Sequence, residues 1–219
     1  VIAGLLADLQ RNRFPQNRAG MSRSGYFARH HFVFEKLIEL ALADQQPLQA
    51  LTLLEESKAR TAQDFLGSME TTGATASIAP RATAEWLADW PADLAAVEYF
   101  LGAEQAWVFL IQGGQVTAYR LLNDQGAPLA SRALVTQVQT ALKNMEGQSL
   151  KIQRRHASKK GFDHSWQDEL AALRNYLLPD ELLDRLRTAS RVLIVPQHIL
   201  HYLPFSALVT TRDTSPRGQ

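Results

Sequence analysis

Apolar residues recur every three or four positions in the first third of the chain. From Phe27 to Ala43 this spacing predicts an amphipathic helix, with an apolar stripe that runs through Phe34, Leu37 and Ile38. Such a stripe requires a packing partner, which we expect to come from the helix that follows.

A second helix is predicted after a short Asp-Gln-Gln turn. Pro47 suits the first turn of a helix, and apolar residues then recur as far as Met69. The predicted apolar face consists of Leu48, Leu51, Leu54, Ala62, Phe65, Leu66 and Met69. Two helices with so tight a connection form an antiparallel helical hairpin.

The hairpin has the character of a repeat unit. Residues 1–14 also have the pattern of a helix end, so residues 1–69 are interpreted as the terminal part of an array of helical repeats. Repeat units bury their apolar faces against neighbours, and further pairs are therefore expected before residue 1. Residues 70–92 are rich in Thr, Ala, Gly and Pro and are interpreted as a linker that includes a short helix.

The periodicity changes after residue 93. Three short runs rich in β-branched and aromatic residues, 94–102, 105–112 and 115–122, predict strands. Gly113 and Gly114 separate the second run from the third and predict a tight hairpin. The three strands are expected to form an antiparallel meander.

Helical patterns then dominate as far as a last apolar run. Helices are predicted over 128–145, 164–178 and 180–186, with a mobile polar loop over 146–162. The run RVLIVP has no polar alternation, which predicts a strand covered on both faces. The predicted fold class is therefore α+β or α/β: a repeat-like helical hairpin followed by an α/β domain with a β-meander.

Composition and charge exclude several classes of function. Lys and Arg number 23 and Asp and Glu 22, so the net charge of +1 indicates no polyanionic partner. The sequence contains no cysteine, which excludes disulfides and a cysteine nucleophile within these 219 residues. No apolar run approaches the roughly 20 residues that cross a bilayer, and no signal peptide is recognised. A cytoplasmic protein with no membrane partner is expected, with a native start upstream of Val1.

Three stretches in fixed order resemble bacterial proteins that join tetratricopeptide-like helices to a CHAT domain. They are residues 50–66, 94–121 and 170–208. The third is the most specific, because its strand ending in IVP, followed by LHYLPFSAL, resembles the segment that leads into the core sheet in this family. The resemblance implies that residues 93–219 are the N-terminal portion of a caspase-like domain of clan CD.

Cysteine proteases of this clan use a His and Cys dyad, in which the thiolate attacks the scissile carbonyl. The resemblance places both dyad residues downstream of Gln219. It therefore implies a protease that cleaves a protein substrate under the control of its helical repeats, and a fragment that is inactive by itself. No catalytic residue is assigned.

The loop after RVLIVP holds the candidate site residues. In caspase-like folds the corresponding loop lines the pocket for the residue that precedes the cleaved bond, which makes Gln197, His198 and His201 the polar candidates. The alternative is structural: His201 hydrogen-bonds to the backbone while Tyr202, Leu203 and Phe205 pack.

Neither a metal nor a cofactor is predicted. The histidines lack the HExxH spacing, and no glycine-rich phosphate loop or GxSxG motif occurs. Residues 151–160 carry five basic side chains, a pattern that also suits phosphate binding. We favour a solvated loop and expect no nucleic-acid partner, because no interleaved aromatic is present for base stacking.

Two functions remain open from the sequence. The first is the regulated protease, with a protein substrate or regulatory protein bound through the helical repeats. The alternative is a non-catalytic interaction scaffold with a degenerate CHAT domain. The residues downstream of Gln219 would distinguish the two.

Overall fold

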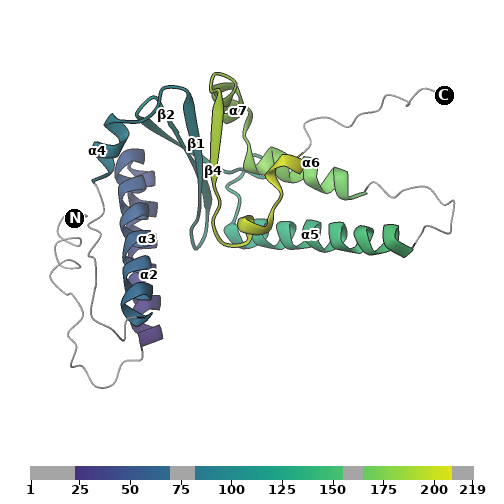
Figure 1. Cartoon of the computed structure of the whole chain (residues 1–219), viewed down its shortest axis with the longest axis horizontal. Helices are drawn as coiled ribbons and strands as arrows, with labels where there is room; N and C mark the ends of the chain where they lie inside the picture. Colours follow the sequence, from purple (N-terminus) through teal and green to yellow (C-terminus); the bar gives the residue numbers. More distant parts are fainter. Residues whose placement is uncertain (1–22, 70–81, 155–164, 209–219) are drawn as a thin grey trace. The chain divides into compact units, whose positions relative to one another are not determined.

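The computed structural model describes residues 23–69, 82–154 and 165–208 (Figure 1). The chain divides into two compact units, residues 1–86 and 87–219. Each unit is described by itself. The fold is of the α+β class, with helices and one four-stranded mixed sheet.

The first unit contains the predicted helical hairpin. Helix α2 (Arg23–Ala43) and helix α3 (Pro47–Met69) lie side by side and are joined by a turn at residues 44–46 (Figure 1). Their buried apolar side chains are Phe34, Leu37, Ile38, Ala41 and Leu42 in α2, with Ala50, Leu51, Leu53 and Leu54 in α3. The hairpin prediction is confirmed, including the start of α3 at Pro47.

The predicted apolar face of α3 is wrong in part. Leu48 is 44% exposed and Ala62 is exposed, whereas Ala50 and Leu53 are buried. At 100° per residue, Leu48 and Ala62 are turned more than a quarter turn away from the centre of the stripe that faces α2. The side chains of Phe65, Leu66 and Met69 lie outside the described residues.

A short helix, α4 (Thr83–Ala88), precedes the sheet. Its residues fall within the predicted linker, where a short helix was expected. The indole Nε1 of Trp90 donates a hydrogen bond to the Leu94 carbonyl at 2.8 Å. This bond fixes the chain just before the first strand begins.

The sheet has the order β3-β2-β1-β4. Strands β1 (Leu94–Leu101), β2 (Ala106–Gln112) and β3 (Gln115–Arg120) form the predicted antiparallel meander, which is confirmed. Gly113 and Gly114 have φ of +57° and +74° and make the tight hairpin between β2 and β3. Strand β4 (Arg191–Val195) pairs with β1 in parallel.

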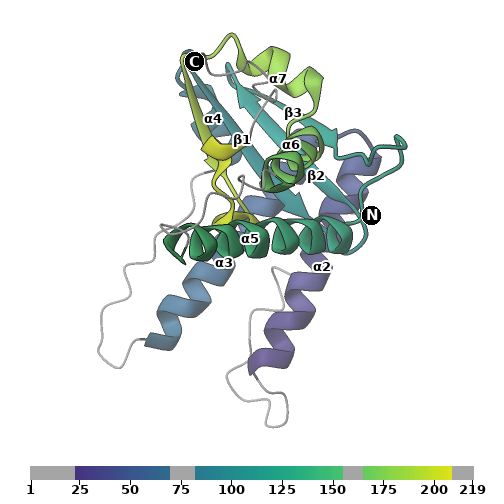
Figure 2. The same ribbon diagram turned by 90° about the vertical axis from the view of Figure 1, so that its right-hand side faces the viewer.

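Three helices follow the meander: α5 (Ser131–Arg154), α6 (Ser165–Leu177) and α7 (Asp180–Leu186). Figure 2 shows α5 and α6 in front of one face of the sheet. The core on this face comprises Ala95, Val97 and Tyr99 of β1, Ala106, Val108 and Leu110 of β2, and helical residues that include Leu134, Val138, Leu170, Leu173 and Leu182.

Tyr99 ties the sheet to α6. Its ring is buried, and its hydroxyl donates a hydrogen bond to the Leu177 carbonyl at 3.0 Å. Burial raises the pKa of the Tyr99 phenol, so the hydroxyl stays protonated and remains a donor.

The polar loop predicted over 146–162 is wrong in its first part, because α5 continues to Arg154. Apart from Gly147, most residues of this segment are good helix formers, namely Glu, Gln, Leu, Lys and Arg, which permits the extension. The remainder of the predicted loop lies outside the described residues.

The prediction that RVLIVP forms a strand is confirmed, but the prediction that both faces of this strand are covered is wrong. Residues 191–195 form a strand, but Arg191, Val192 and Leu193 are exposed. Among the described residues β4 has a neighbouring strand only on its β1 side. A continuous apolar run does not distinguish a central strand from an apolar edge strand, so it predicted a cover that the described residues do not provide.

Candidate functional site

The candidate residues follow β4, at one end of the sheet. Because β1 and β4 are parallel, their carboxyl ends meet at this end, where α/β sheets place their ligand-binding loops. The loop consists of residues 196–208 and contains two short 3-10 helices, η1 (His198–Tyr202) and η2 (Phe205–Ala207).

Gln197 fixes the start of the loop. Its side-chain Oε1 accepts a hydrogen bond from the Leu101 main-chain N–H at 2.6 Å. Leu101 is the last residue of β1, so this bond joins the ends of two parallel strands. Gln197 therefore fixes the loop to the end of β1 through its side-chain oxygen.

His198 occupies an unusual backbone conformation. Its φ is +54°, in the left-handed region, and the Leu200 N–H closes the turn by donating to the Gln197 carbonyl at 3.1 Å. For a residue with a Cβ this conformation costs about 1–2 kcal/mol. The surrounding anchors therefore hold His198 in place, and its side chain is exposed.

Apolar residues anchor the rest of the loop. Leu200 and Leu203 are buried in the core beneath the sheet. The Phe205 ring lies against Tyr99 with ring centroids 5.6 Å apart. The loop is thus held at three apolar points as well as by Gln197.

The structural alternative for this loop holds only in part. Leu203 and Phe205 pack as that alternative expected, but Tyr202 is 73% exposed and does not pack. In a 3-10 turn side chains three apart lie on the same side, so Leu200 and Leu203 take the buried side together and leave Tyr202 outside.

The structure brings Gln197, His198 and His201 together on one loop. His198 and His201 are exposed and Gln197 is half-buried. The arrangement offers two imidazoles and the Tyr202 hydroxyl to solvent at the end of the sheet. It provides hydrogen-bonding groups for recognition, and it includes no nucleophile paired with a base.

An ion pair lies at the start of β4, at the end of the sheet opposite the candidate loop. The Arg191 guanidinium donates two hydrogen bonds to the Asp93 carboxylate, each at 2.9 Å. The Asp93 carbonyl also accepts from the main-chain N–H groups of Ser190 and Arg191. The hydrogen bond from Arg191 lowers the pKa of the Asp93 carboxyl, and Asp93 in turn raises the pKa of Arg191. Sequence reasoning missed this pair, because 98 positions separate the two residues.

A second tyrosine bonds to a carboxylate on the surface of the same unit. The Tyr176 hydroxyl in α6 donates to Asp124 Oδ2 at 2.6 Å. This bond, with burial as a further cause, raises the pKa of Tyr176. It holds the loop after β3 against α6 and is remote in sequence from the candidate loop.

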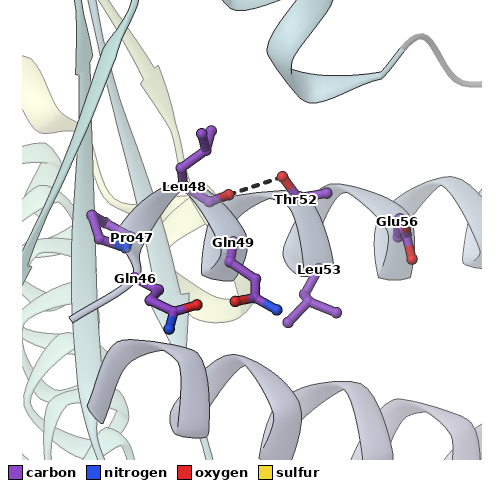
Figure 3. Close-up of a pocket in the computed structure, with 7 residues that line it drawn as sticks. All are labelled: Gln46, Pro47, Leu48, Gln49, Thr52, Leu53 and Glu56. Carbon is purple, nitrogen blue, oxygen red and sulfur yellow. Dashed lines mark hydrogen bonds between the residues drawn. The ribbon is translucent and has the colours of Figure 1, made fainter. Parts of the chain in front are cut away.

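An open hollow lies beside the first turns of α3 in the first unit (Figure 3). Gln46, Gln49 and Leu53 point to one side of the helix and Leu48 and Thr52 to the other. Thr52 Oγ1 donates back to the Leu48 carbonyl at 2.9 Å. The surface of the hollow is mostly apolar, and the Thr52 hydroxyl donates to the main chain and not to the Glu56 carboxylate, so the hollow shows no pairing of a nucleophile with a base.

Neither a metal-binding cluster nor a membrane-spanning helix occurs among the described residues. Within these residues, no group of three or more His, Asp or Glu side chains is placed to hold a metal ion. Among the same residues no helix has both the length and the apolar character required to cross a membrane. Of the basic segment 151–160, residues 151–154 form the end of α5 and the rest lies outside the described residues.

Comparisons with protein-family models, with curated proteins and with solved structures gave no significant match to this chain.

Proposed function

We propose that residues 93–219 are the front part of a caspase-like domain in a CHAT-family cysteine protease, and that the helical hairpin ends a tetratricopeptide-like array that binds a protein substrate or regulator. The observation that supports the proposal best is the parallel β1 and β4 pair with its anchored loop. A loop held at the carboxyl end of parallel strands is where α/β proteins bind ligands.

The catalytic step has to be supplied from outside residues 1–219. The sequence contains no cysteine, so the thiolate of a His and Cys dyad is not among these residues. His198 and His201 are recognition candidates and are not proposed as the dyad histidine. Residues 1–219 alone are therefore proposed to be inactive.

The proposal is tested on a longer protein from the same gene that extends about 150 residues past Gln219, a length typical of completing such a domain. We expect it to cleave a denatured protein substrate and to lose this activity with iodoacetamide, while residues 1–219 do not cleave. A downstream sequence without a His and a Cys would contradict the proposal.

The role of the loop is tested in the same active protein. If His201 contacts the residue before the cleaved bond, His201→Ala changes the sequence preference in a peptide library, whereas Leu122→Ala, exposed and on another loop, does not. An unchanged preference in both variants would assign the loop a structural role only.

A non-catalytic scaffold is the second candidate. The observation that favours it is the apolar surface of the hairpin, where Phe32, Leu40 and Leu48 are 55%, 48% and 44% exposed. Phe32 and Leu40 lie on α2 and Leu48 lies on α3, and exposed apolar side chains on helices suit the docking of another helix. A longer protein that binds partners through these residues but cleaves nothing would support this candidate.

A further inference from the structure

The first turn of helix α5 has no internal cap. Ala130 precedes the helix, and its carbonyl accepts the first helical hydrogen bond, from the Leu134 main-chain N–H at 3.1 Å. Ala130 is therefore the N-cap residue, and alanine has no side-chain oxygen that could accept from the first turn. Among the described residues, no acceptor is found for the main-chain N–H groups of Ser131, Arg132 and Ala133.

A buried hydroxyl without a partner lies in the same turn. Ser131 is 7% exposed, and its Oγ has no hydrogen-bond partner among the described residues. Buried hydroxyls in folded proteins are nearly always hydrogen-bonded, so this one points to a partner from outside these residues. Because the Cα–Cβ bonds of a helix tilt toward its N-terminus, the Ser131 side chain leaves the main chain toward the open end of α5.

The electrostatic character of this turn is positive. The helix dipole places partial positive charge at the start of α5, and the first turn contains no acidic residue. The Arg132 side chain is exposed and forms no ion pair with any residue that the structure describes. The carboxylate nearest before it in sequence, Asp124, accepts a hydrogen bond from the Tyr176 hydroxyl. The start of α5 therefore offers donors and positive charge together.

We propose that the first turn of α5 binds a phosphate group, with the first-turn main-chain N–H groups, the Ser131 hydroxyl and the Arg132 guanidinium as donors. Main-chain N–H groups at helix N-termini bind anions in this way. Phosphate is favoured over a carboxylate, because it carries more than one negative charge at neutral pH and a guanidinium can bind two of its oxygens at once. The inference does not depend on protease activity.

The proposed site lies at the same end of the sheet as the candidate loop. Just before α5, the Leu129 carbonyl accepts a hydrogen bond from the Ala106 N–H at 3.0 Å. Ala106 begins β2 and pairs with Leu101, the last residue of β1, whose N–H donates to Gln197. Helix η1 of the loop also contacts α5. Phosphate would therefore bind at the end of the sheet where α/β proteins bind their ligands.

An NMR titration of residues 1–219 with inorganic phosphate, at constant pH and ionic strength, tests the inference. We expect saturable shifts of the amide signals of Arg132 and Ala133. Acetate at the same concentrations should bind several-fold more weakly, because it carries a single charge. Acetate that binds as tightly as phosphate would overturn the assignment of a phosphate site.

Four variants assign the site. Ala130→Asp places a carboxylate at the N-cap, where it occupies the same N–H groups, and should lower phosphate affinity by about tenfold. Gln139→Glu makes the same change of charge on an exposed position two turns along α5, and should leave the affinity within about twofold. Arg132→Gln and Ser131→Ala should each weaken binding by about two- to fivefold. The dispersion of the amide signals confirms that each variant is folded.

Three outcomes would overturn the inference. Wild type whose Arg132 and Ala133 signals do not shift with phosphate has no such site. Unchanged affinity in Ala130→Asp would place the phosphate elsewhere on the protein. An equal loss in Ala130→Asp and Gln139→Glu would show that binding follows net charge and not the open helix end.

Discussion

The two edges of the sheet are built in opposite ways. Strand β3 enters through a Gly-Gly hairpin, ends in the polar residues Gln115 and Arg120, and has half-buried side chains between them. Strand β4 is apolar from Val192 to Val195, yet its first apolar residues are nearly half exposed. Within the described residues, β3 is polar at both of its ends, whereas β4 exposes apolar side chains. The two outer strands of the sheet are therefore not equivalent in the kind of side chain that they expose.

The largest effect on the β4 side is expected from its anchor. Leu200 is fully buried beneath the sheet and holds the loop that follows β4. Leu200→Ala removes this packing and should lower the free energy of unfolding by about 2–5 kcal/mol. Urea denaturation measures the loss. Tyr202→Ala, two residues along and 73% exposed, is the control and should change stability little. Equal losses in the two variants would contradict the anchoring role.

On the β3 side the hairpin is the sensitive point. Gly114 has φ +74°, and a Cβ placed on it would lie 2.9 Å from the Leu87 carbonyl oxygen. Gly114→Val should therefore cost roughly 2 kcal/mol or more, from backbone strain and the close contact together. Gly113→Asn is the matched control, because a Cβ there meets nothing within 4 Å and Asn tolerates φ near +57°. The melting temperatures of the two variants measure the difference. A larger drop for Gly113→Asn than for Gly114→Val would contradict this account.

At His198 a substitution is expected to raise the free energy of unfolding instead of lowering it. Its φ of +54° costs a residue with a Cβ free energy that glycine avoids. His198→Gly should raise the free energy of unfolding by up to about 1 kcal/mol, since the greater chain entropy of glycine offsets part of the gain. A loss of stability on chemical denaturation would show that the imidazole makes contacts that outweigh the strain.

The Asp93 and Arg191 pair should give the smallest effect, because both side chains are about half exposed or more. The folded-state pKa of Asp93 is lowered below its ordinary value of 3.8. The pair therefore stabilises the fold above that value, and the contribution disappears as pH falls through the lowered pKa. Asp93→Asn should flatten this part of the profile of unfolding free energy against pH. An NMR titration in which the Asp93 pKa is not lowered would contradict the pair.

Much of the secondary structure was predictable from the sequence. The hairpin from Pro47, the meander and its Gly-Gly turn follow from periodicity and turn chemistry, which are local properties of the chain. The exposure of Val192 and the ion pair of Asp93 with Arg191 were not predictable. Both depend on which segments become neighbours across long separations in sequence, and an apolar run states only that a side chain is apolar, without saying what covers it.

For the candidate loop too, the sequence predicted the position of the segment but not its contacts or backbone conformation. The segment at Gln197, His198 and His201 was identified from its sequence, but the bond from Leu101 to Gln197 and the positive φ of His198 arise from the pairing of β1 with β4. Periodicity also did not separate the buried Leu203 from the exposed Tyr202, because the turn is too short to show a period.

The most direct measurement of the difference between the edges is the rate of thiol labelling in single-cysteine variants. The chain has no cysteine of its own, so each variant reports one position. Leu193 on β4 is 48% exposed, whereas Val116 on β3 is half-buried. With a maleimide reagent, Leu193→Cys should react faster than Val116→Cys in the folded protein, and the two variants should react alike in urea. Equal rates in the folded protein, or faster labelling of Val116→Cys, would contradict the account.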